Sequence, residues 1–445
     1  MFSDFPSDFV SRVLSDDFLG AEKLLHALNT DSPVSIRKNP LKINSELTVK
    51  SAVEWCENAY YLPERPSFIK DPLFHAGTYY PQEAGSMFLD AILKQLHLPD
   101  APRVLDLCAS PGGKSTLIAS WLQGKGLLVS NEVIHARSKV LKENMTKWGV
   151  SNSVVTSNDP ADFERLPNYF DLIVVDAPCS GEGMFRKDKD ARKEWSSDNV
   201  QLCTARQKRI VMDVWDALQP GGYLVYSTCT FNAEENEKNV AWFLSETASE
   251  LIAIESSCFK NGRENIGYYA LPSEVDTEGF FIAVLRKTGE AKIRKLTWKK
   301  KVDLTVFTNE KLKELYQSAE NTVVQWKEFL FSVPTDFLED IYYLYAHLHT
   351  IKLGTEIGEV TQKGWNPKEG LALNPRIQNS EIQRIDLSLE QALSYLHGDT
   401  FSVDAKQGYY LMTYKQEPLG WIKHLGNRFN NLYPKEWRIK MRLDR

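Results

Sequence analysis

Hydrophobic residues after about position 102 fall into short runs, and the segments between several of these runs have helical spacing. The strand-like runs are 103–108, 127–133, 153–157, 171–178, 222–228 and 280–286. A representative segment between them is AEENEKNVAWFLSE, residues 233–246, whose apolar positions recur with a helical period. This alternation predicts an α/β domain with a mostly parallel sheet and helices on both faces.

The regions on either side of this domain have different patterns. Residues 7–28 have the spacing of amphipathic helices, and mixed short elements follow them. Residues 309–330 also predict a helix, whereas the last hundred residues combine glycine-containing turns with short strand signals such as GYYLMTYKQEPLGWIK. We therefore expect four parts: a helical or mixed N-terminal domain (1–75), the α/β domain (76–290), a basic linker with a helical segment (291–340) and a small β-rich domain (341–445).

The composition is that of a protein that folds into several globular domains. The chain has 445 residues, of which 42% are hydrophobic and 25% charged. No apolar run reaches the roughly 18 residues that span a membrane, and the first residues lack the basic region of a secretory signal. The six cysteines are scattered without a C-x-x-C pair, which argues against a zinc site and a disulfide scaffold. We expect a cytoplasmic protein without a metal.

The net charge of −6 argues against nucleic acid as a partner, but the charge is unevenly distributed. Residues 286–301 contain eight basic residues and one acidic residue, and residues 421–445 contain seven Lys or Arg and two acids. Basic stretches interleaved with aromatic residues can hold phosphates and stack bases. On charge alone, a solvated linker and a solvated tail explain them equally well.

A glycine-containing loop, in DLCASPGGKST, follows the first predicted strand of the α/β domain. It has neither the Walker A spacing nor the G-x-G-x-x-G spacing of dinucleotide-binding loops. Glu132 follows the second strand, where a carboxylate can bind two ribose hydroxyls. Asp159 follows the third strand and is either a contact to an adenine amino group or a loop-capping residue. A nucleoside cofactor is expected, and the missing dinucleotide motif favours a methyltransferase over a dehydrogenase.

Two cysteines follow neighbouring predicted strands. Asp176 and Cys179 lie in VVDAPCSG after the fourth strand, and Cys229 lies after the fifth. A thiolate that adds to carbon 6 of cytosine makes carbon 5 able to attack a methyl sulfonium, and a second group must then remove the carbon 5 proton. Asn232 and Glu235 have the spacing of an N-cap for the next helix. The residues alone leave open which cysteine attacks, and a free cysteine is more often part of a core.

Taken together, several motifs make the chain similar to the Sun-domain RNA cytosine-C5 methyltransferases. They are DLCASPGGK, DAPCSGEGMFRK, YSTCT with EENE, GFFIAVL, SIRKN and YYPQEAGSM, over roughly residues 30–290. The segments RKDKDARKEWS and GWIKHLGNRFNNLYP resemble the F group of bacterial 16S ribosomal RNA methyltransferases. The resemblance implies a class I, Rossmann-like S-adenosylmethionine-dependent methyltransferase fold with a C-terminal PUA-like RNA-binding domain.

The same resemblance implies roles for individual residues. Cys229 is expected to be the nucleophile, Cys179 to assist proton removal and product release, and Asp176 to contact the target base. Cofactor contacts are expected from Cys108, Ala109, Ser110, Pro111, Gly112, Gly113, Lys114, Glu132, Asp159 and Asp176. Ser110 stands where alanine is common, and KGWNPKEGLAL departs from the basic-aromatic segment of relatives. Lys187 is either a phosphate contact or a surface lysine.

The sequence therefore predicts an enzyme that uses S-adenosyl-L-methionine to methylate carbon 5 of cytidines in 16S ribosomal RNA. The substrate is free RNA or the 30S subunit, and the enzyme is expected to be a monomer. One alternative is a non-catalytic RNA-binding or ribosome-assembly factor, and another is methylation of a different RNA such as tRNA. A small-molecule methyltransferase would leave the basic, aromatic C-terminal module without a function.

Overall fold

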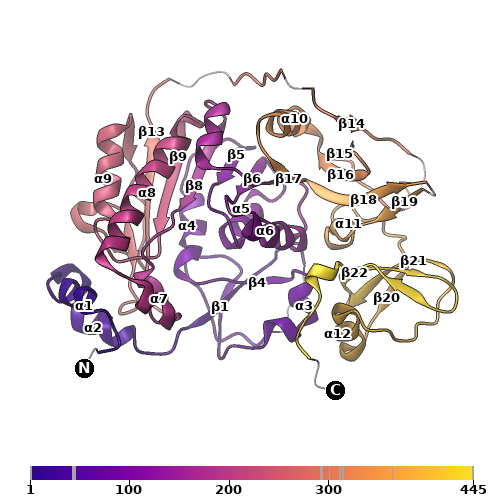
Figure 1. Cartoon of the computed structure of the whole chain (residues 1–445), viewed down its shortest axis with the longest axis horizontal. Helices are drawn as coiled ribbons and strands as arrows, with labels where there is room; N and C mark the ends of the chain where they lie inside the picture. The colour runs from indigo at the N-terminus through magenta and orange to yellow at the C-terminus, as the bar shows by residue number, and fades with distance from the viewer. Residues whose placement is uncertain are drawn as a thin grey trace.

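A central mixed sheet organises the chain (Figure 1); the alternating pattern correctly predicts its parallel core, but antiparallel strands extend the sheet at both sides. The computed structural model describes residues 3–42, 47–290, 294–299, 301–309, 312, 315–362 and 364–442. The strand order is β11-β12-β13-β9-β8-β5-β6-β7-β17, and β10 also pairs with β13. Strands β7, β6, β5, β8 and β9 run parallel, while β13 and β17 pair antiparallel at the two sides of this parallel core.

The parallel strands and β13 are largely buried because helices cover both faces of the sheet, whereas β10 and β11 are partly exposed. The strands are β5 (Arg103–Asp106), β6 (Leu127–Asn131), β7 (Ser153–Thr156), β8 (Phe170–Asp176), β9 (Leu218–Thr228), β10 (Ser249–Leu251), β11 (Lys260–Asn261), β12 (Tyr268–Ala270), β13 (Phe280–Lys287) and β17 (Thr350–Leu353). The helices are α4 (Leu89–Leu93), α5 (Gly113–Leu122), α6 (His135–Trp148), α7 (Lys189–Glu194), α8 (Ser197–Trp215), α9 (Glu237–Glu246) and α10 (Leu338–His347). Neighbouring residues of a strand point to opposite faces of the sheet. Val104 packs in one core with α5, and Leu105 packs in the other core with α8, as expected for a sheet that helices cover on both faces.

The N-terminal region packs against this domain as two helices and a small antiparallel sheet. Its elements are α1 (Ser7–Leu14), α2 (Ala21–Ala27), β1 (Val34–Lys38), β2 (Ser51–Ala52), β3 (Ala59–Leu62), α3 (Pro72–His75) and β4 (Tyr79–Pro81), with strand order β2-β3-β1-β4. Arg37, from the SIRKN motif in β1, is 2% exposed. Its guanidinium donates to the Gly113 and Thr116 carbonyls at 3.3 Å each, which attaches β1 to the first turn of α5.

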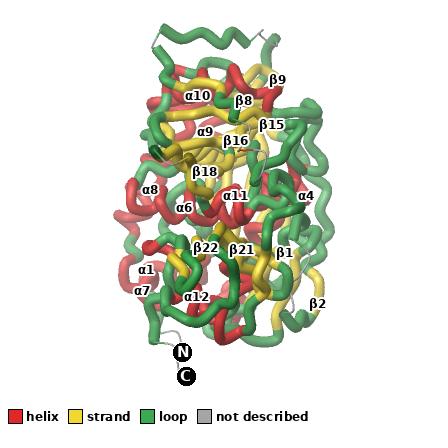
Figure 2. Tube along the Cα trace, turned by 90° about the vertical axis from the view of Figure 1, so that its right-hand side faces the viewer, coloured by secondary structure: helices red, strands yellow, loops and turns green. Residues whose placement is uncertain are grey.

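The C-terminal region contains two further sheets. The first has the order β14-β15-β16-β18-β19, and the second has the order β20-β21-β22-β23. The elements are β14 (Leu304–Val306), β15 (Asn321–Trp326), β16 (Phe329–Pro334), β18 (Thr355–Thr361), β19 (Gly364–Pro367), α11 (Glu369–Leu373), β20 (Arg384–Asp386), α12 (Leu389–His397), β21 (Gly408–Tyr414), β22 (Glu417–His424) and β23 (Phe429–Asn431). Helix α11 lies between β18 and β22 and also contacts α6, so it joins both sheets to the central domain (Figure 2).

The helix predicted for residues 309–330 is wrong. The described part of its second half forms β15 and the start of β16, which pair antiparallel from Asn321 to Pro334. The β-branched residues Val323 and Val324 favour a strand, and Lys327 adopts the left-handed conformation (φ 54°) in the tight turn between the strands. Residues 310, 311, 313 and 314 of this prediction lie outside the described residues.

Part of the predicted basic linker packs against the central domain. Arg294 donates to the Tyr169 carbonyl at 2.8 Å and forms an ion pair with Asp171, and Lys287 donates to the Trp215 carbonyl at 2.9 Å. Residues 291–293 and 300 of the run, and residues 443–445 of the C-terminal basic stretch, lie outside the described residues. Among the described helices, none is both long and apolar enough to cross a bilayer.

Candidate active site

A cavity of about 770 Å³ opens at the carboxyl ends of the parallel strands. Loops that follow β5, β6, β7, β8 and β9 all contribute to its wall, because parallel strands end at the same edge of a sheet. Of the predicted site residues, Gly112 does not line this cavity; those that do are Cys108, Ala109, Ser110, Pro111, Gly113, Lys114, Glu132, Asp159, Asp176, Cys179 and Cys229. Predicted site residues up to 121 positions apart in the sequence, from Cys108 to Cys229, thus converge on one cavity, and Lys187 lies at its exposed rim.

The glycine-containing loop between β5 and α5 is held by α6. Gly112 has a left-handed conformation (φ 119°) just before α5 begins, which a residue with a side chain adopts only with strain. The Ser110 hydroxyl donates to the Arg137 carbonyl at 3.0 Å, and the Asn144 amide donates to the Pro111 carbonyl at 2.7 Å. These contacts fix the loop backbone beside the cavity.

Glu132 and Asp159 both face the cavity and both make local contacts. The Glu132 carboxylate accepts from the Ile134 amide at 2.9 Å and lies 3.4 Å from the Arg137 guanidinium. Asp159 accepts from the Ala161 amide at 3.1 Å at the start of a short 3-10 helix, Pro160–Arg165. Asp159 therefore is a capping residue, as one interpretation of the sequence holds, and it also lines the cavity.

The walls of this part of the cavity fit a nucleoside cofactor that carries an amino group. Leu107, Ile134 and Pro160 supply apolar surface. Asp106, buried at the end of β5, accepts from the Ser115 hydroxyl at 2.6 Å, while its Oδ1 has no hydrogen-bond partner among the described residues. Burial raises the pKa of Asp106 to about 7. Asp106 is fully buried and does not line the cavity, so the carboxylates that would meet a cofactor here are those of Glu132 and Asp159.

Asn131 is a residue that the sequence analysis missed. Its side chain is buried below the cavity, where its amide donates to the carbonyls of Leu107 and Asn158 at 3.1 and 3.0 Å. Its Oδ1 accepts from the Thr156 hydroxyl at 2.9 Å. One amide thereby connects the ends of three strands, and the only signal in the sequence is a polar residue at the end of an apolar run.

Asp176 and Lys114 form an ion pair inside the cavity. The Lys114 Nζ lies 2.8 Å from one carboxylate oxygen of Asp176, and the Ser227 hydroxyl donates to the other at 2.9 Å. The Lys114 side chain is 9% exposed and its ammonium lies 5.0 Å from the centroid of the Phe280 ring. This arrangement places a cation and a carboxylate, both with remaining hydrogen-bonding capacity, at one point of the cavity wall.

The two cysteines are neighbours in space. The Cys179 and Cys229 Sγ atoms lie 2.8 Å apart, and the Cys229 amide donates to the Cys179 sulfur at 3.2 Å. Both cysteines are free thiols and are partly exposed. The hydrogen bond with Cys229, together with burial, holds the pKa of Cys179 well above its usual range. These two effects favour the protonated form of Cys179.

The loop that carries Cys229 differs from its prediction. Asn232 and Glu235 do not form the expected N-cap, because α9 begins later, at Glu237, and Asn232 instead accepts from the Glu234 amide at 3.0 Å. Glu235 is fully buried and accepts from Ser180, the residue after Cys179. The N-cap prediction fails because Glu235 bonds to Ser180 in the other cysteine-bearing loop, a tertiary contact that a local capping pattern does not reveal.

Two glycines allow these loops to cross. The Gly183 amide donates to the Cys229 carbonyl at 2.9 Å, and the Gly279 amide donates to the Gly183 carbonyl at 3.2 Å. A Cβ atom added to Gly183 would lie 2.2 Å from the Gly279 carbonyl oxygen. The motifs that contain Cys179, Cys229 and Phe280 thus depend on close backbone contact.

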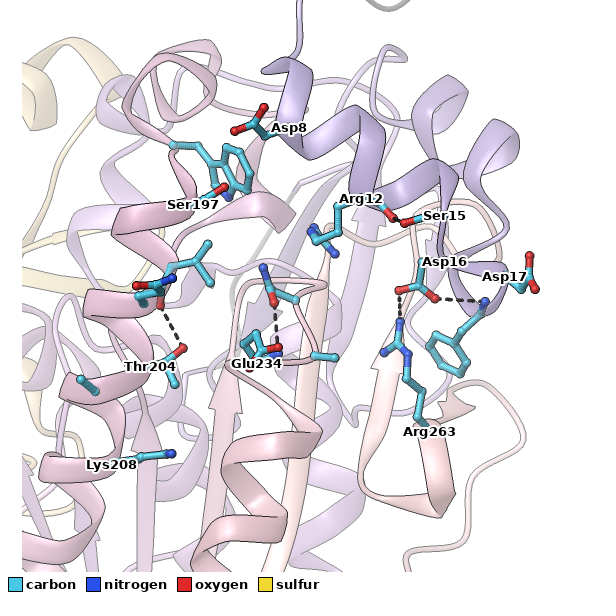
Figure 3. Close-up of a pocket in the computed structure, with 17 residues that line it drawn as sticks. Asp8, Arg12, Ser15, Asp16, Asp17, Ser197, Thr204, Lys208, Glu234 and Arg263 are labelled. Atoms are coloured by element: carbon cyan, nitrogen blue, oxygen red, sulfur yellow. Dashed lines mark hydrogen bonds and ion pairs between the residues drawn. The ribbon is translucent and has the colours of Figure 1, made fainter.

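A second cavity, of about 920 Å³, lies between α1, α8 and the loop 232–234 (Figure 3). Acidic and basic side chains both occur at this cavity: Asp16 forms an ion pair with Arg263, and Arg12 forms one with Glu182 at 2.6 Å. None of the predicted site residues, all of which are described, lines it. The predicted site residues, apart from Gly112, therefore line the cavity at the strand ends.

Comparisons with known proteins agree with this geometry. Residues 93–286 match the family described as 16S rRNA methyltransferase RsmB/F. Residues 5–84 match the N-terminal domain of 16S rRNA methyltransferase RsmF, and residues 382–439 match the methyltransferase RsmF PUA domain. The chain thus matches three successive family models over most of its length.

Whole-chain relatives are similar in sequence. The chain is 31% identical to ribosomal RNA small subunit methyltransferase F of Shewanella piezotolerans, over 97% of each chain. It is 33% identical to the protein of the same name from Shigella boydii, over 97% of this chain and 96% of the relative.

Solved structures share the fold. A methyltransferase homologue from Pyrococcus horikoshii is 28% identical, with a TM-score of 0.55 over 64% of this chain and 95% of that one. NSun6 from Pyrococcus horikoshii, solved with SFG, is 21% identical with a TM-score of 0.56, over 65% of this chain and 100% of that one. The second likeness concerns the fold alone.

Proposed function

Because the chain belongs to the ribosomal RNA small subunit methyltransferase F family, we propose that it methylates carbon 5 of cytidines in 16S ribosomal RNA with S-adenosyl-L-methionine. The observation that carries this proposal is the cysteine pair, with 2.8 Å between the sulfur atoms, in the same cavity as the Lys114–Asp176 ion pair. Two thiols beside a paired carboxylate are what methylation at a ring carbon needs, whereas methylation of an amino group needs no nucleophile.

Cys229 is the nucleophile in this proposal. Its thiolate adds to carbon 6 of the cytosine, which breaks the aromaticity of the ring and makes carbon 5 nucleophilic. S-adenosyl-L-methionine, when bound by the loop 108–114, Glu132 and Asp159, supplies the electrophilic methyl group. Cys179 retains its proton during the attack because its thiol donates to the Cys229 sulfur.

The remaining side chains orient the ring and complete the cycle. Asp176 and Lys114 present a carboxylate and an ammonium that can hydrogen-bond to the polar edge of the cytosine. Once the Cys229 sulfur is bonded to carbon it is a weaker hydrogen-bond partner, which lessens the main cause of the raised pKa of Cys179. Cys179 can then lose its proton to solvent and accept the carbon 5 proton, while the bond between carbon 6 and Cys229 breaks and Cys229 leaves as a thiolate.

The target must leave its base stack to reach the thiols, because the cavity lies at the ends of the strands. The PUA-like domain and the described basic residues of the C-terminal stretch would add affinity that falls with salt. The relatives' names favour 16S ribosomal RNA as the substrate.

Bisulfite sequencing of 16S ribosomal RNA tests this proposal. RNA from cells that lack the gene should lose protection at one or more cytosines, and the gene restored on a plasmid should recover it. The Cys229→Ala variant, expressed to the same level, should not restore protection. Unchanged protection at every cytosine in the deletion strain would refute cytosine methylation of this RNA. Transfer of labelled methyl groups to free 16S RNA and to 30S subunits would identify the substrate form.

A further inference from the structure

One buried carboxylate connects the two cysteine-bearing loops. The Glu235 Oε2 accepts from the Ser180 amide and from the Gln207 side chain, at 2.9 Å each, and its Oε1 accepts from the Ser180 hydroxyl at 2.5 Å. The Ser180 Oγ also lies 3.1 Å from the Thr230 Oγ1. Ser180 follows Cys179 and Thr230 follows Cys229, so the two hydroxyls connect the residues after both thiols, and the carboxylate holds Ser180 in place.

Glu235 also affects which thiol keeps a proton. The hydrogen bond with Cys229 is the largest cause of the raised pKa of Cys179, followed by burial and by the charges of Cys229 and Glu235. Burial raises the pKa of Glu235 to about 7, so its carboxylate carries its full negative charge above neutral pH, and there it disfavours a second negative charge nearby. Other titratable groups that face this cluster are Cys203 and Arg206 of α8, Tyr226 of β9 and Glu182.

We propose that Glu235 is a positioning residue that holds the two thiols together and keeps the shared proton on Cys179, so that Cys229 is the attacking group. This inference rests on the proposed function and adds to it a physical reason for the division of roles. Cys229 releases its own proton to the solvent in the cavity, and the Cys179 thiol donates a hydrogen bond to the resulting thiolate. The loop contacts of Glu235 maintain the spacing that this bond requires.

Two substitutions separate the two effects of Glu235. Glu235→Gln removes the charge but keeps the shape: its carbonyl oxygen can accept from the Ser180 amide and Gln207, and its amide can donate to the Ser180 hydroxyl. Glu235→Ala removes both the charge and the contacts. Glu237→Gln is a matched control, because Glu237 is another buried carboxylate of the same segment and bonds to Arg263 and Tyr269 instead.

The test is alkylation of the full-length protein with iodoacetamide between pH 6 and 9, with each cysteine quantified by peptide mass spectrometry. In the wild type and in Glu237→Gln, Cys229 should react faster than Cys179 by about tenfold or more, because the thiolate is the form that iodoacetamide alkylates. Glu235→Gln should reduce this preference severalfold, and Glu235→Ala should abolish it. With RNA, Glu235→Gln should lower kcat with little change in KM and shift its pH profile.

If both Glu235 variants are alkylated at Cys229 as selectively as the wild type, the inference is overturned. It is also overturned if the wild type reacts faster at Cys179 than at Cys229. A Glu235→Ala variant that does not fold still leaves the result for Glu235→Gln to decide. Alkylation needs neither RNA nor a methyl donor, so it reports on the thiols even if bisulfite sequencing refutes cytosine methylation. Conversely, if cytosine methylation is found but the Glu235 variants are alkylated like the wild type, the role of Glu235 is rejected and the proposed function stands.

Discussion

Glu369, the first residue of α11, should make the stability of this protein depend on pH in an unusual direction. It is 7% exposed, and its Oε1 has no hydrogen-bond partner among the described residues. The neighbouring Lys368 pairs at 2.7 Å with Glu359, so it offers only partial compensation. Burial raises the pKa of Glu369 from its ordinary 4.5 to about 8.

The sign of the effect follows from proton binding. Between pH 4.5 and about 8 the folded state keeps the Glu369 proton while the unfolded chain loses it, so the free energy of unfolding falls as pH rises through this window. One unit of difference between the folded and unfolded pKa is worth about 1.4 kcal/mol, which gives roughly 3–5 kcal/mol across the window. Glu369→Gln cannot ionise and should escape this loss.

Urea denaturation at pH 5, 7 and 9, followed by tryptophan fluorescence, measures the effect. Trp421 is a nearby reporter, because its indole donates to the Lys368 carbonyl at 3.0 Å. Glu369→Gln should match the wild type at pH 5 and exceed it by roughly 3–5 kcal/mol at pH 9. The exposed Glu381→Gln is the control and should follow the wild type. If the wild-type and Glu369→Gln profiles run parallel from pH 5 to 9, the reasoning is refuted.

Three further outcomes are expected. Cys179→Ala should accumulate a covalent protein–RNA adduct on a denaturing gel and Cys229→Ala none, since attack proceeds while release stalls; the reverse pattern would assign the attack to Cys179. Arg37→Met should lower the free energy of unfolding in urea by about 2–3 kcal/mol, because it removes hydrogen bonds from a buried cation to carbonyls of α5, and a loss below about 1 kcal/mol would contradict this. Gly183→Ala should lower the melting temperature and methyl transfer, because its Cβ would meet a backbone oxygen at 2.2 Å; wild-type values would refute the close crossing.

Much of the α/β domain is predictable because its signals are local. Buried parallel strands must be short and apolar, and the connections between them carry helical spacing, so the runs at 103–108 and 171–178 lie where β5 and β8 form. The position of the cavity follows from the same pattern, since residues after parallel strands meet at one sheet edge. Asp176 and Cys229 converge for this reason.

Local signals failed where a residue's partner lies far along the chain. The charged residues before position 320 resemble those of a helix, but strand pairing with β16 and β18 determines the conformation of β15 and its neighbours. Arg294 and Lys287 belong to a basic run, yet both are bound to backbone carbonyls of the central domain. Charge counting along the sequence does not distinguish such internal cations from a surface that binds RNA.

The sequence by itself determined the sheet, the loop that follows its first strand, and the set of side chains at its edge, because each depends on the spacing of neighbouring residues. Only the tertiary structure decided how the two thiols differ. Cys179 and Cys229 each follow a parallel strand, and their inequality arises from a 2.8 Å contact and from Glu235, 55 residues away from its partner Ser180. Hydrogen bonds and desolvation act over a few ångströms in space, whereas a sequence pattern records only distance along the chain.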